Sequence, residues 1–522
     1  MHLRKPTLSA PALLPLLRLL PALALVLAGP AAAAGWPQLT QLAHSGARVS
    51  AAALDLGSGR LIAELHAGER VTPASLTKLA VAAAALERWP VDRVFRTTLM
   101  TTAPATTGRL DGDLILQGDG DPSLDDQSLW GLAARLRGAG VLQVTGRLIV
   151  HPAPFALVGC ETRDRCDALQ RSDRSYNAPL GAVGVDFGNW CVLVQPAVAG
   201  SPALVRGCGV TRLPIEVEGD VHTVGARGRS TFWVERVTQD GVDRLRVGGD
   251  VPEGEPQQLY RAMSDPVLGA GLLLKEMLRE LGVNVAGGVV TTNNPPLPSA
   301  YALAQTSGLA LSEQLGRMLR YSNNYIADVL TLDLAAEHAP QPPDRLAQAA
   351  SVLSAFVATL PRTRGEGGAH AAAAQTGIGA TIVGNGPAGS ATTVDPPPLY
   401  SGSGLTPENL LSADELVALL ARQYRDPRHF PAFYGLLVVP RDAPFAFLRQ
   451  GSEDWLDRVA LKTGSMDDPH SVLGIAGYLR RRDGGFIAFT AIVNGGGQRP
   501  RIPLNEALAA ARSDVEGLLR QY

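Results

Sequence analysis

Apolar and polar residues alternate strongly near the C-terminal end of the chain, and this period of two is typical of β-strands with one buried face. The pattern predicts strands at residues 458–463, 471–480 and 486–493, and two further strands are predicted at residues 48–56 and 60–65, on either side of a turn at Gly57-Ser58-Gly59. Elsewhere apolar residues recur every three to four positions, which is the period of an amphipathic helix. This second pattern predicts helices at residues 75–89, 309–334, 412–424 and 504–520.

The middle of the chain has a different pattern, with short apolar segments separated by Gly, Asp and Pro turns. These segments predict strands at residues 114–116, 147–151, 215–217, 231–237 and 244–247, with a hairpin turn at Gln239-Asp240-Gly241. We therefore expect an α/β (α+β) domain that consists of an antiparallel sheet flanked by helices. In the sequence, this domain is split by a large β-rich insert. The predicted domain consists of residues 35–95 and 297–522, and the insert of residues 96–296. Within the insert, residues 96–180 and 262–296 are predicted to form one subdomain and residues 181–261 the other. Residues 362–398 are rich in Gly, Ala, Thr and Pro and are predicted to form a long loop.

The N-terminus has the pattern of a secretory signal peptide. A short basic region that includes Arg4 and Lys5 precedes an apolar stretch at residues 19–28, and Ala32-Ala33-Ala34 offers a small-residue cleavage site. A retained membrane anchor fits less well, because Arg18 interrupts the apolar residues that a span of about 20 would need. We expect residues 1–34 to be removed and the mature chain to have no membrane span. The protein would then be exported, to the periplasm if the cell has an outer membrane and otherwise to the extracellular or cell-wall space.

The bulk composition suits a large globular protein and gives no sign of a polyanion partner, although a local basic patch could still exist. The chain has 522 residues, of which 46% are hydrophobic and 18% charged, and its net charge is −2. Nucleic-acid binding requires a basic surface that displaces counterions, so no nucleic-acid partner is expected.

Four cysteines lie in the predicted insert, at positions 160, 166, 191 and 208. An even number in an exported chain favours disulfides. A zinc site is the alternative, but no C-x-x-C pair and no histidine at ligand spacing accompanies them. We therefore expect no metal and no cofactor.

The distribution of lysine draws attention to the catalytic candidates. The chain has four lysines, Lys5, Lys78, Lys275 and Lys462, and its other 43 basic residues are arginine. Arginine stays charged and cannot act as a general base, so a lysine in such a chain suggests a position where arginine would fail. Lys275 is predicted to be an ordinary surface residue.

Lys78 lies three residues after Ser75, in Ser75-Leu76-Thr77-Lys78 at the start of a predicted helix, which places both side chains on one helical face. A lysine with a depressed pKa can take the serine proton, and the helix start can receive an oxyanion. The plain alternative is an N-capping serine with an exposed lysine, and the motif alone occurs often by chance.

Two further motifs follow. Lys462-Thr463-Gly464-Ser465 ends a predicted strand, where an edge can bind an extended peptide and Lys462 can anchor a carboxylate. Tyr321-Ser322-Asn323-Asn324 lies between helical stretches, where a hydroxyl can relay a proton and an amide can bind a lysine and a peptide carbonyl. The plain alternative for the first of these motifs is a strand end with a turn, and for the second it is a helix N-cap.

Taken together, the three motifs resemble the penicillin-recognising serine enzymes. Within them the chain is similar to the D-alanyl-D-alanine carboxypeptidase/endopeptidase family of the penicillin-binding protein 4 type, which carries a large insert between its first two motifs. Ser75 and Ser322 are 247 residues apart here. Further matches are Gly118-Asp119-Gly120-Asp121-Pro122, Tyr176-Asn177-Ala178-Pro179 and Gly402-Ser403-Gly404-Leu405.

The resemblance implies a fold like that of serine β-lactamases and an acyl-enzyme mechanism on peptidoglycan stem peptides, with penicillin as a covalent inhibitor. It implies that Ser75 attacks between two D-alanines, Lys78 takes its proton and Ser322 relays a proton to the departing amine. Lys462, Thr463 and Ser465 would hold the terminal carboxylate, Asn324 the peptide backbone, and the N–H groups of Ser75 and Ser465 the oxyanion.

The chain departs from the family pattern at three places. Ser401 stands where an acidic residue is usual, Thr406-Pro407 stand where an Arg usually follows, and Asn323 stands where Asp is common. A β-lactamase or esterase on the same scaffold is one alternative. A non-catalytic wall-binding protein is another.

We predict the pairings Cys160–Cys166 and Cys191–Cys208, because nearest-neighbour pairing closes the two shortest loops. Four cysteines allow three pairings, and peptide mapping without reduction distinguishes them. A crossed pairing or a free thiol at any of the four would contradict this expectation.

Overall fold

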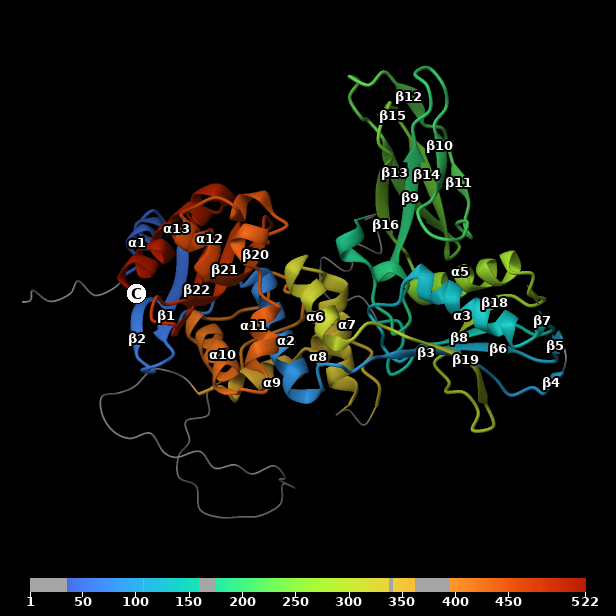
Figure 1. The fold of residues 1–522 in the computed structure, drawn as a ribbon, viewed down its shortest axis with the longest axis horizontal. Coiled ribbons are helices and arrows are strands. Elements are labelled where there is room, and N and C mark those ends of the chain that lie inside the picture. The colour runs from blue at the N-terminus through green and yellow to red at the C-terminus, as the bar shows by residue number, and fades with distance from the viewer. Residues whose placement is uncertain (1–34, 107, 159–173, 338–340, 362–394) are drawn as a thin grey trace, which may run out of the picture. The chain divides into compact units, whose positions relative to one another are not determined.

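Five antiparallel strands from both ends of the chain form one sheet (Figure 1). β1 (Arg48–Asp55) and β2 (Leu61–Leu65) come from the N-terminal side, and β20 (Val459–Met466), β21 (Val472–Arg480) and β22 (Phe486–Asn494) from the C-terminal side. The strand order is β2-β1-β22-β21-β20, which places β20 at an edge. The five strands predicted from the sequence for this part of the chain are confirmed. The computed structural model describes residues 35–106, 108–158, 174–337, 341–361 and 395–522.

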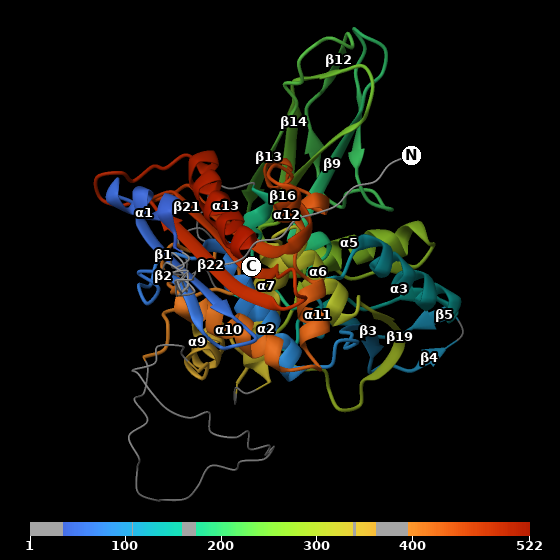
Figure 2. The same ribbon diagram turned by 60° about the vertical axis from the view of Figure 1, so that its left-hand side comes forward.

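Helices cover both faces of this sheet (Figure 2). α1 (Pro37–His44) and α13 (Leu504–Gln521) pack on one face, and α2 (Lys78–Arg88) and α10 (Ala413–Arg425) pack on the other. Alternate residues of β1 contribute to the two opposite cores, as the pleat requires. The prediction of an antiparallel sheet flanked by helices is therefore confirmed.

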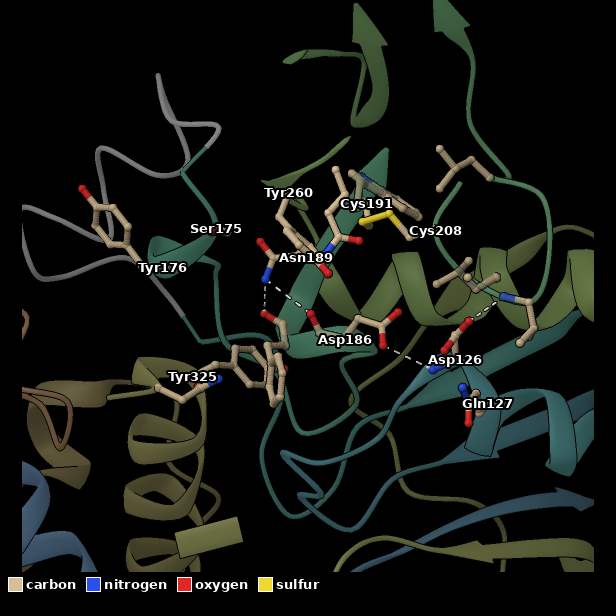
Figure 3. A pocket seen from close by; sticks show the side chains of 18 of the residues that line it. Asp126, Gln127, Ser175, Tyr176, Asp186, Asn189, Cys191, Cys208, Tyr260 and Tyr325 are labelled. Carbon is tan, nitrogen blue, oxygen red and sulfur yellow. Dashed lines mark hydrogen bonds between the residues drawn. A yellow bond between two sulfur atoms is a disulfide. The ribbon is translucent and has the colours of Figure 1, made fainter. Parts of the chain in front are cut away.

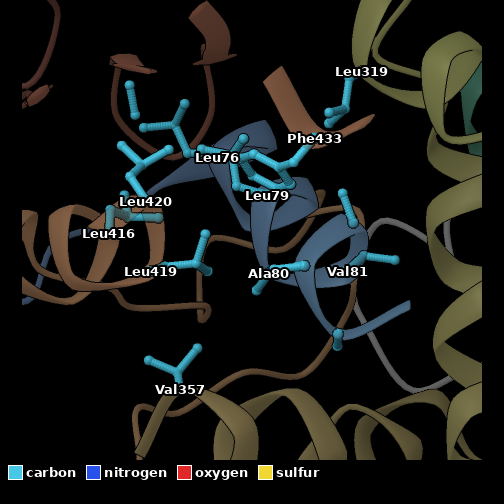
Figure 4. Packing of buried hydrophobic residues seen from close by; sticks show 14 of the residues in the cluster. Leu76, Leu79, Ala80, Val81, Leu319, Val357, Leu416, Leu419, Leu420 and Phe433 are labelled. Carbon is cyan, nitrogen blue, oxygen red and sulfur yellow. The ribbon is translucent and has the colours of Figure 1, made fainter. Parts of the chain in front are cut away.

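α2 is held in place by apolar contacts on several sides (Figure 4). Its residues 78–86 are all buried. Leu79 belongs to one core cluster with Leu419 of α10, with Phe433 of α11 (Phe430–Gly435) and with Val357 of α9 (Ser351–Ala358). Close packing of this kind leaves little freedom for the start of α2, where Lys78 ends the first candidate motif.

Two predicted helices deviate from regular geometry at the motifs. The helix predicted at 75–89 begins with a 3₁₀ turn, η1 (Ala74–Thr77), and only then continues as α2. The stretch predicted at 309–334 divides into α6 (Leu311–Arg320) and α7 (Asn324–Ala336), because Ser322 has a φ of +57° that no helix can accommodate. Two further helices are short: α8 (Leu346–Ala349) packs against α7, and α12 (Glu453–Arg458) packs against α13.

The middle of the chain forms a mixed five-stranded sheet in the order β18-β8-β6-β3-β19. Its strands are β3 (Arg96–Thr101), β6 (Leu114–Gln117), β8 (Leu148–His151), β18 (Val289–Thr291) and β19 (Tyr301–Ser307). A smaller sheet contains β4 (Ala105–Thr106), β5 (Gly108–Leu110), β7 (Val141–Val144) and β17 (Asn284–Val285). β19 joins the larger sheet although it lies beyond residue 296. The domain boundaries stay a prediction.

Two long helices pack on these strands, α3 (Asp126–Gly138) and α5 (Pro266–Glu280). α3 was not predicted, although Leu129, Leu132, Ala133 and Leu136 recur at helical spacing and are buried. Lys275 of α5, predicted to be an ordinary surface residue, is half-buried, and its Nζ donates to the Gly287 carbonyl at 2.7 Å.

The strands from residue 189 to residue 262 form three small sheets. They are β9 (Asn189–Gln195), β10 (Leu204–Gly207), β11 (Val217–Glu218), β12 (His222–Val224), β13 (Trp233–Gln239), β14 (Val242–Gly248), β15 (Asp250–Pro252) and β16 (Gln257–Ala262). The predicted hairpin turn is confirmed, since Asp240 and Gly241 both have positive φ between β13 and β14.

The disulfide Cys191–Cys208 is present, as predicted, and it ties β9 to the segment after β10. Cys160 and Cys166 lie outside the described residues, as does most of the predicted 362–398 loop. In the part of the chain that the structure describes, no helix combines the length and apolar character needed to cross a membrane.

Candidate active site

Ser75 and Lys78 meet where η1 passes into α2. Lys78 Nζ donates a hydrogen bond to Ser75 Oγ at 2.8 Å, and the Lys78 side chain is fully buried. Nζ also donates to Asn324 Oδ1 at 2.8 Å and to the Ser403 carbonyl at 2.7 Å. A buried amine requires such partners, because its desolvation is costly. The predicted nucleophile and base are thus within proton-transfer distance.

The turn between α6 and α7 supplies two groups to the site. Ser322, at φ +57°, lies near the middle of this turn. Asn323 caps α7, because its Oδ1 accepts from the Ile326 N–H at 2.9 Å, so the plain N-cap interpretation holds for this residue. Asn324 contacts Lys78 through Oδ1, and its Nδ2 donates to the Tyr176 carbonyl at 3.1 Å. The amide of Asn324 is therefore fixed from both sides.

Lys462 forms a second serine–lysine pair. Its Nζ donates to Ser322 Oγ at 3.0 Å and to the Thr463 carbonyl at 2.6 Å, and its side chain is 1% exposed. No carboxylate within the described residues forms an ion pair with it. Burial lowers the pKa of Lys462 from its usual range to about 7.

Gly464 allows β20 to lie against the nucleophile turn. A Cβ at this position would be 2.6 Å from the Pro73 carbonyl oxygen and 3.1 Å from the Ser75 nitrogen. Any larger residue would push the strand away from η1. The neighbours Thr463 and Ser465 lie on the opposite face of β20 from Lys462 and Gly464, by the alternation of a strand. Thr463 is half-buried and Ser465 exposed, so both hydroxyls are available to a ligand.

The Gly402–Leu405 segment lies against η1 and α2, beside the site. Ser403 offers its carbonyl to Lys78, and its N–H donates to Asp328 Oδ1 at 2.7 Å. Gly404, at φ +72°, passes so close to η1 that a Cβ would lie 1.9 Å from the Ala74 oxygen. Ser401, which stands where an acidic residue is usual, accepts from the Gly404 N–H at 3.2 Å. A hydroxyl therefore holds this turn.

Five of the seven predicted residues are joined in two adjacent networks. Ser75, Lys78 and Asn324 form one, and Ser322 and Lys462 form the other. Thr463 and Ser465 lie on β20 beside them, and the structure gives their side chains no hydrogen bond within the described residues. The roles of the Ser403 and Tyr176 carbonyls were missed, although both residues lie in motifs that matched the family.

Comparison with known proteins identifies the family. A family model described as D-Ala-D-Ala carboxypeptidase 3 (S13) matches residues 37–359 and 392–514. The chain belongs to this S13 family. Membership makes it a serine hydrolase, as the motifs predicted.

Relatives of this S13 chain include a D-alanyl-D-alanine carboxypeptidase of Actinomadura sp. The two are 28% identical over 492 residues, which cover 91% of this chain and 83% of the relative. The crystal structure of penicillin binding protein 4 from Haemophilus influenzae matches with a TM-score of 0.70 at 21% identity, covering 92% of this chain and 99% of that one. The same Haemophilus protein complexed with a novel β-lactam gives a TM-score of 0.66 at 20% identity and the same coverage. The predicted penicillin-binding-protein fold is therefore confirmed.

We predict that Lys462 loses its proton as pH rises through about 7, because its burial favours the neutral amine. The mature chain is expected to contain three lysines, so NMR of protein labelled with ¹³C-lysine can follow each one. The Lys462→Arg variant assigns the signal by removing it. A Lys462 that is still protonated at pH 9 would contradict the prediction.

Proposed function

We propose that this S13 enzyme is a D-Ala-D-Ala carboxypeptidase, and also a D,D-endopeptidase, that acts on peptidoglycan stem peptides through an acyl-enzyme on Ser75. The observation that carries the proposal is the contact of 2.8 Å between Lys78 Nζ and Ser75 Oγ, inside a buried site with two further oxygen acceptors for the amine. The Actinomadura relative, a D-alanyl-D-alanine carboxypeptidase, supports the substrate class.

In the acylation step, neutral Lys78 takes the proton of Ser75 Oγ as that oxygen attacks the carbonyl between the two D-alanines. The N–H groups of Ser75 and Ser465 stabilise the oxyanion, which the close approach of β20 to η1 supports. The C–N bond then breaks, and the departing amine receives a proton from Ser322, which is reprotonated from Lys462. The distance of 3.0 Å between Ser322 Oγ and Lys462 Nζ supports this relay.

The terminal carboxylate of the substrate lies against β20. The hydroxyls of Thr463 and Ser465 donate to it, and protonated Lys462 supplies positive charge, because a carboxylate beside the amine favours its charged form. Asn324 binds the peptide backbone of the substrate. Water then attacks the ester carbonyl. The Ser322–Lys462 pair, which gave up a proton during acylation, takes the proton of the water, and Lys78 returns its proton to Ser75 Oγ as the C–O bond breaks and the shortened stem leaves. No metal or cofactor takes part in this scheme.

Penicillin acylates Ser75 in this proposal, because its β-lactam carbonyl and carboxylate occupy the places of the scissile carbonyl and the terminal carboxylate. The β-lactam complex of the Haemophilus protein supports this. The predicted signal peptide at 1–34 supports export to the periplasm or cell-wall space, where stem peptides are found.

The β-lactamase alternative predicts rapid release of the acyl group. Purified protein incubated with a chromogenic cephalosporin distinguishes the two, since a D,D-peptidase remains acylated and a β-lactamase turns over. The non-catalytic alternative predicts no labelling by penicillin at all.

Ser75→Ala is expected to abolish both peptide turnover and covalent labelling by penicillin, because the motif offers no second hydroxyl with a lysine three residues on. Intact-mass spectrometry after penicillin treatment measures the adduct. An adduct on the Ala variant would refute the assignment of the nucleophile.

Lys78→Arg is expected to leave the fold intact and to slow acylation by well over tenfold, because arginine keeps the charge but cannot accept the proton. Stopped-flow labelling with fluorescent penicillin gives the rate, and circular dichroism checks the fold. Acylation within about tenfold of the wild-type rate, about 1.4 kcal/mol of barrier, would exclude Lys78 as the base.

A further inference from the structure

The buried amine of Lys78 has a third partner, the Ser403 carbonyl, that takes no step in the proposed mechanism. Protonated lysine has three N–H donors, and Ser75 Oγ, Asn324 Oδ1 and the Ser403 carbonyl lie 2.8, 2.8 and 2.7 Å from Nζ. The neutral amine that acts as a base has only two N–H donors and one lone pair. If Asn324 and Ser403 accept both N–H groups, the lone pair faces Ser75 Oγ, as proton transfer requires.

Asn324 and Ser403 differ in their access to ligands. A cavity of about 660 Å³ lies beside Asn324 and is lined on one side by residues 321–325 (Figure 3). Neither Ser403 nor Lys78 belongs to the lining of this cavity. Ser403 is fully buried, at 0% exposed. A ligand in the cavity can therefore contact Asn324, whereas the Ser403 carbonyl depends on the protein alone for its direction.

Two hydrogen bonds fix the direction of the Ser403 carbonyl. This carbonyl shares its peptide group with the Gly404 N–H, which donates to Ser401 Oγ at 3.2 Å. The Ser403 N–H, on the other side of the same Cα, donates to Asp328 Oδ1 at 2.7 Å. The bond to Asp328 is the shorter, and a carboxylate is a stronger acceptor than a hydroxyl. Asp328 is therefore the main group that turns the carbonyl toward the lysine amine.

The position of Asp328 on α7 suits this role. It follows Asn324 by four residues, which places both side chains on one face of the helix. α7 therefore acts on the Lys78 amine twice, through one side chain directly and through the other by way of a backbone carbonyl. Asp328 is 0% exposed. A buried carboxylate has a desolvation cost that an apolar side chain of similar size lacks, so packing alone does not explain this residue.

Asn409 holds the start of the same segment without help from Asp328. Its Oδ1 accepts from the Tyr400 N–H at 2.8 Å and from the Ser401 N–H at 3.3 Å. Its Nδ2 donates to the Ser401 carbonyl at 2.9 Å, and its side chain is fully buried. Loss of the Asp328 carboxylate is therefore expected to free the backbone at Ser403 without displacing the whole segment.

We propose that Asp328 is a positioning residue for the base. Through the backbone of Ser403, it directs the lone pair of Lys78 toward the nucleophile. The inference rests on the proposed function, because it takes Lys78 as the base of acylation. Asp328 contacts neither the substrate nor the reacting atoms and transfers no proton, so it acts on the rate of acylation and not on binding.

The test separates binding from acylation, with penicillin as the probe. Stopped-flow measurements over a range of penicillin concentrations give the dissociation constant of the initial complex and the rate constant of acylation. Asp328→Ala removes the acceptor, and Asp328→Asn keeps an oxygen in its place. Asp328→Val, which also lacks an acceptor but leaves a smaller void, replaces the Ala variant if circular dichroism shows that the latter does not fold. Val329→Ala is the matched control, because Val329 is buried at the next position of α7 and belongs to a different apolar cluster from α2.

We expect Asp328→Ala to slow acylation by about tenfold or more, because a small misplacement of a reacting group is costly, and to leave the dissociation constant within about twofold of wild type. Asp328→Asn should acylate within about threefold of the wild-type rate, since the acceptor is kept, and Val329→Ala at that rate. An Ala variant as fast as wild type, or a control as slow as the Ala variant, overturns the proposal. So does an Asn variant as slow as the Ala variant, because the charge and not the acceptor would then matter.

NMR of protein labelled with ¹³C-lysine gives a readout that does not depend on activity. Asp328→Ala should shift the Lys78 Cε signal, which the Lys78→Arg variant assigns. The Lys462 signal should stay in place, because Lys462 belongs to the other network, and Val329→Ala should move neither. Slow acylation with an unchanged Lys78 signal overturns the proposal. If penicillin does not acylate even wild type, the proposed function fails, and the Lys78 signal alone decides: a shift supports the positioning role and its absence overturns it.

Discussion

The buried amine of Lys78 is the interaction on which the rest of the site depends. Its three oxygen partners come from three segments, at positions 75, 324 and 403, which are distant in sequence. A buried amine without partners would be strongly destabilising, so each segment must reach its place for the others to be satisfied. The positive φ of Ala74 and Ser322, on two segments of the site, is the kind of backbone strain that persists only where the surroundings fix it.

The sequence predicted the main sheet and the motifs well, because both depend on local pattern. Alternation marks strands whose two faces meet different cores, and seven candidate side chains followed from three short motifs. The contributions of Ser403 and Tyr176 could not be predicted in this way, since each acts through its backbone carbonyl, which every residue has. The 3₁₀ turn at Ser75 was also missed, because nothing in residue type distinguishes it from the first turn of an α-helix.

The Gly118–Pro122 motif, which has no part in the proposed chemistry, has an explanation in packing. Gly120 passes α7 so closely that a Cβ would lie 1.9 Å from Asp333 Oδ1, and Gly308 approaches Asp121 Oδ2 in the same manner. Burial raises the pKa of Asp121 to about 6 and that of Asp333 well above its usual range. The motif therefore fixes α7, and with it Asn324, against the middle of the chain.

Pairing of β1 with β22 has a consequence for how the enzyme matures. Residues 48–55 align with residues 487–494, so more than 400 residues must be synthesised between the two partners. Contacts of such large sequence separation close late, since the entropy of a long loop is lost before they form. The nucleophile helix can exist early, but β20 and Lys462 reach it only with the last strands. In the proposed mechanism, competence for acylation is thus a late event of folding, because an incomplete chain carries Ser75 without β20 and Lys462.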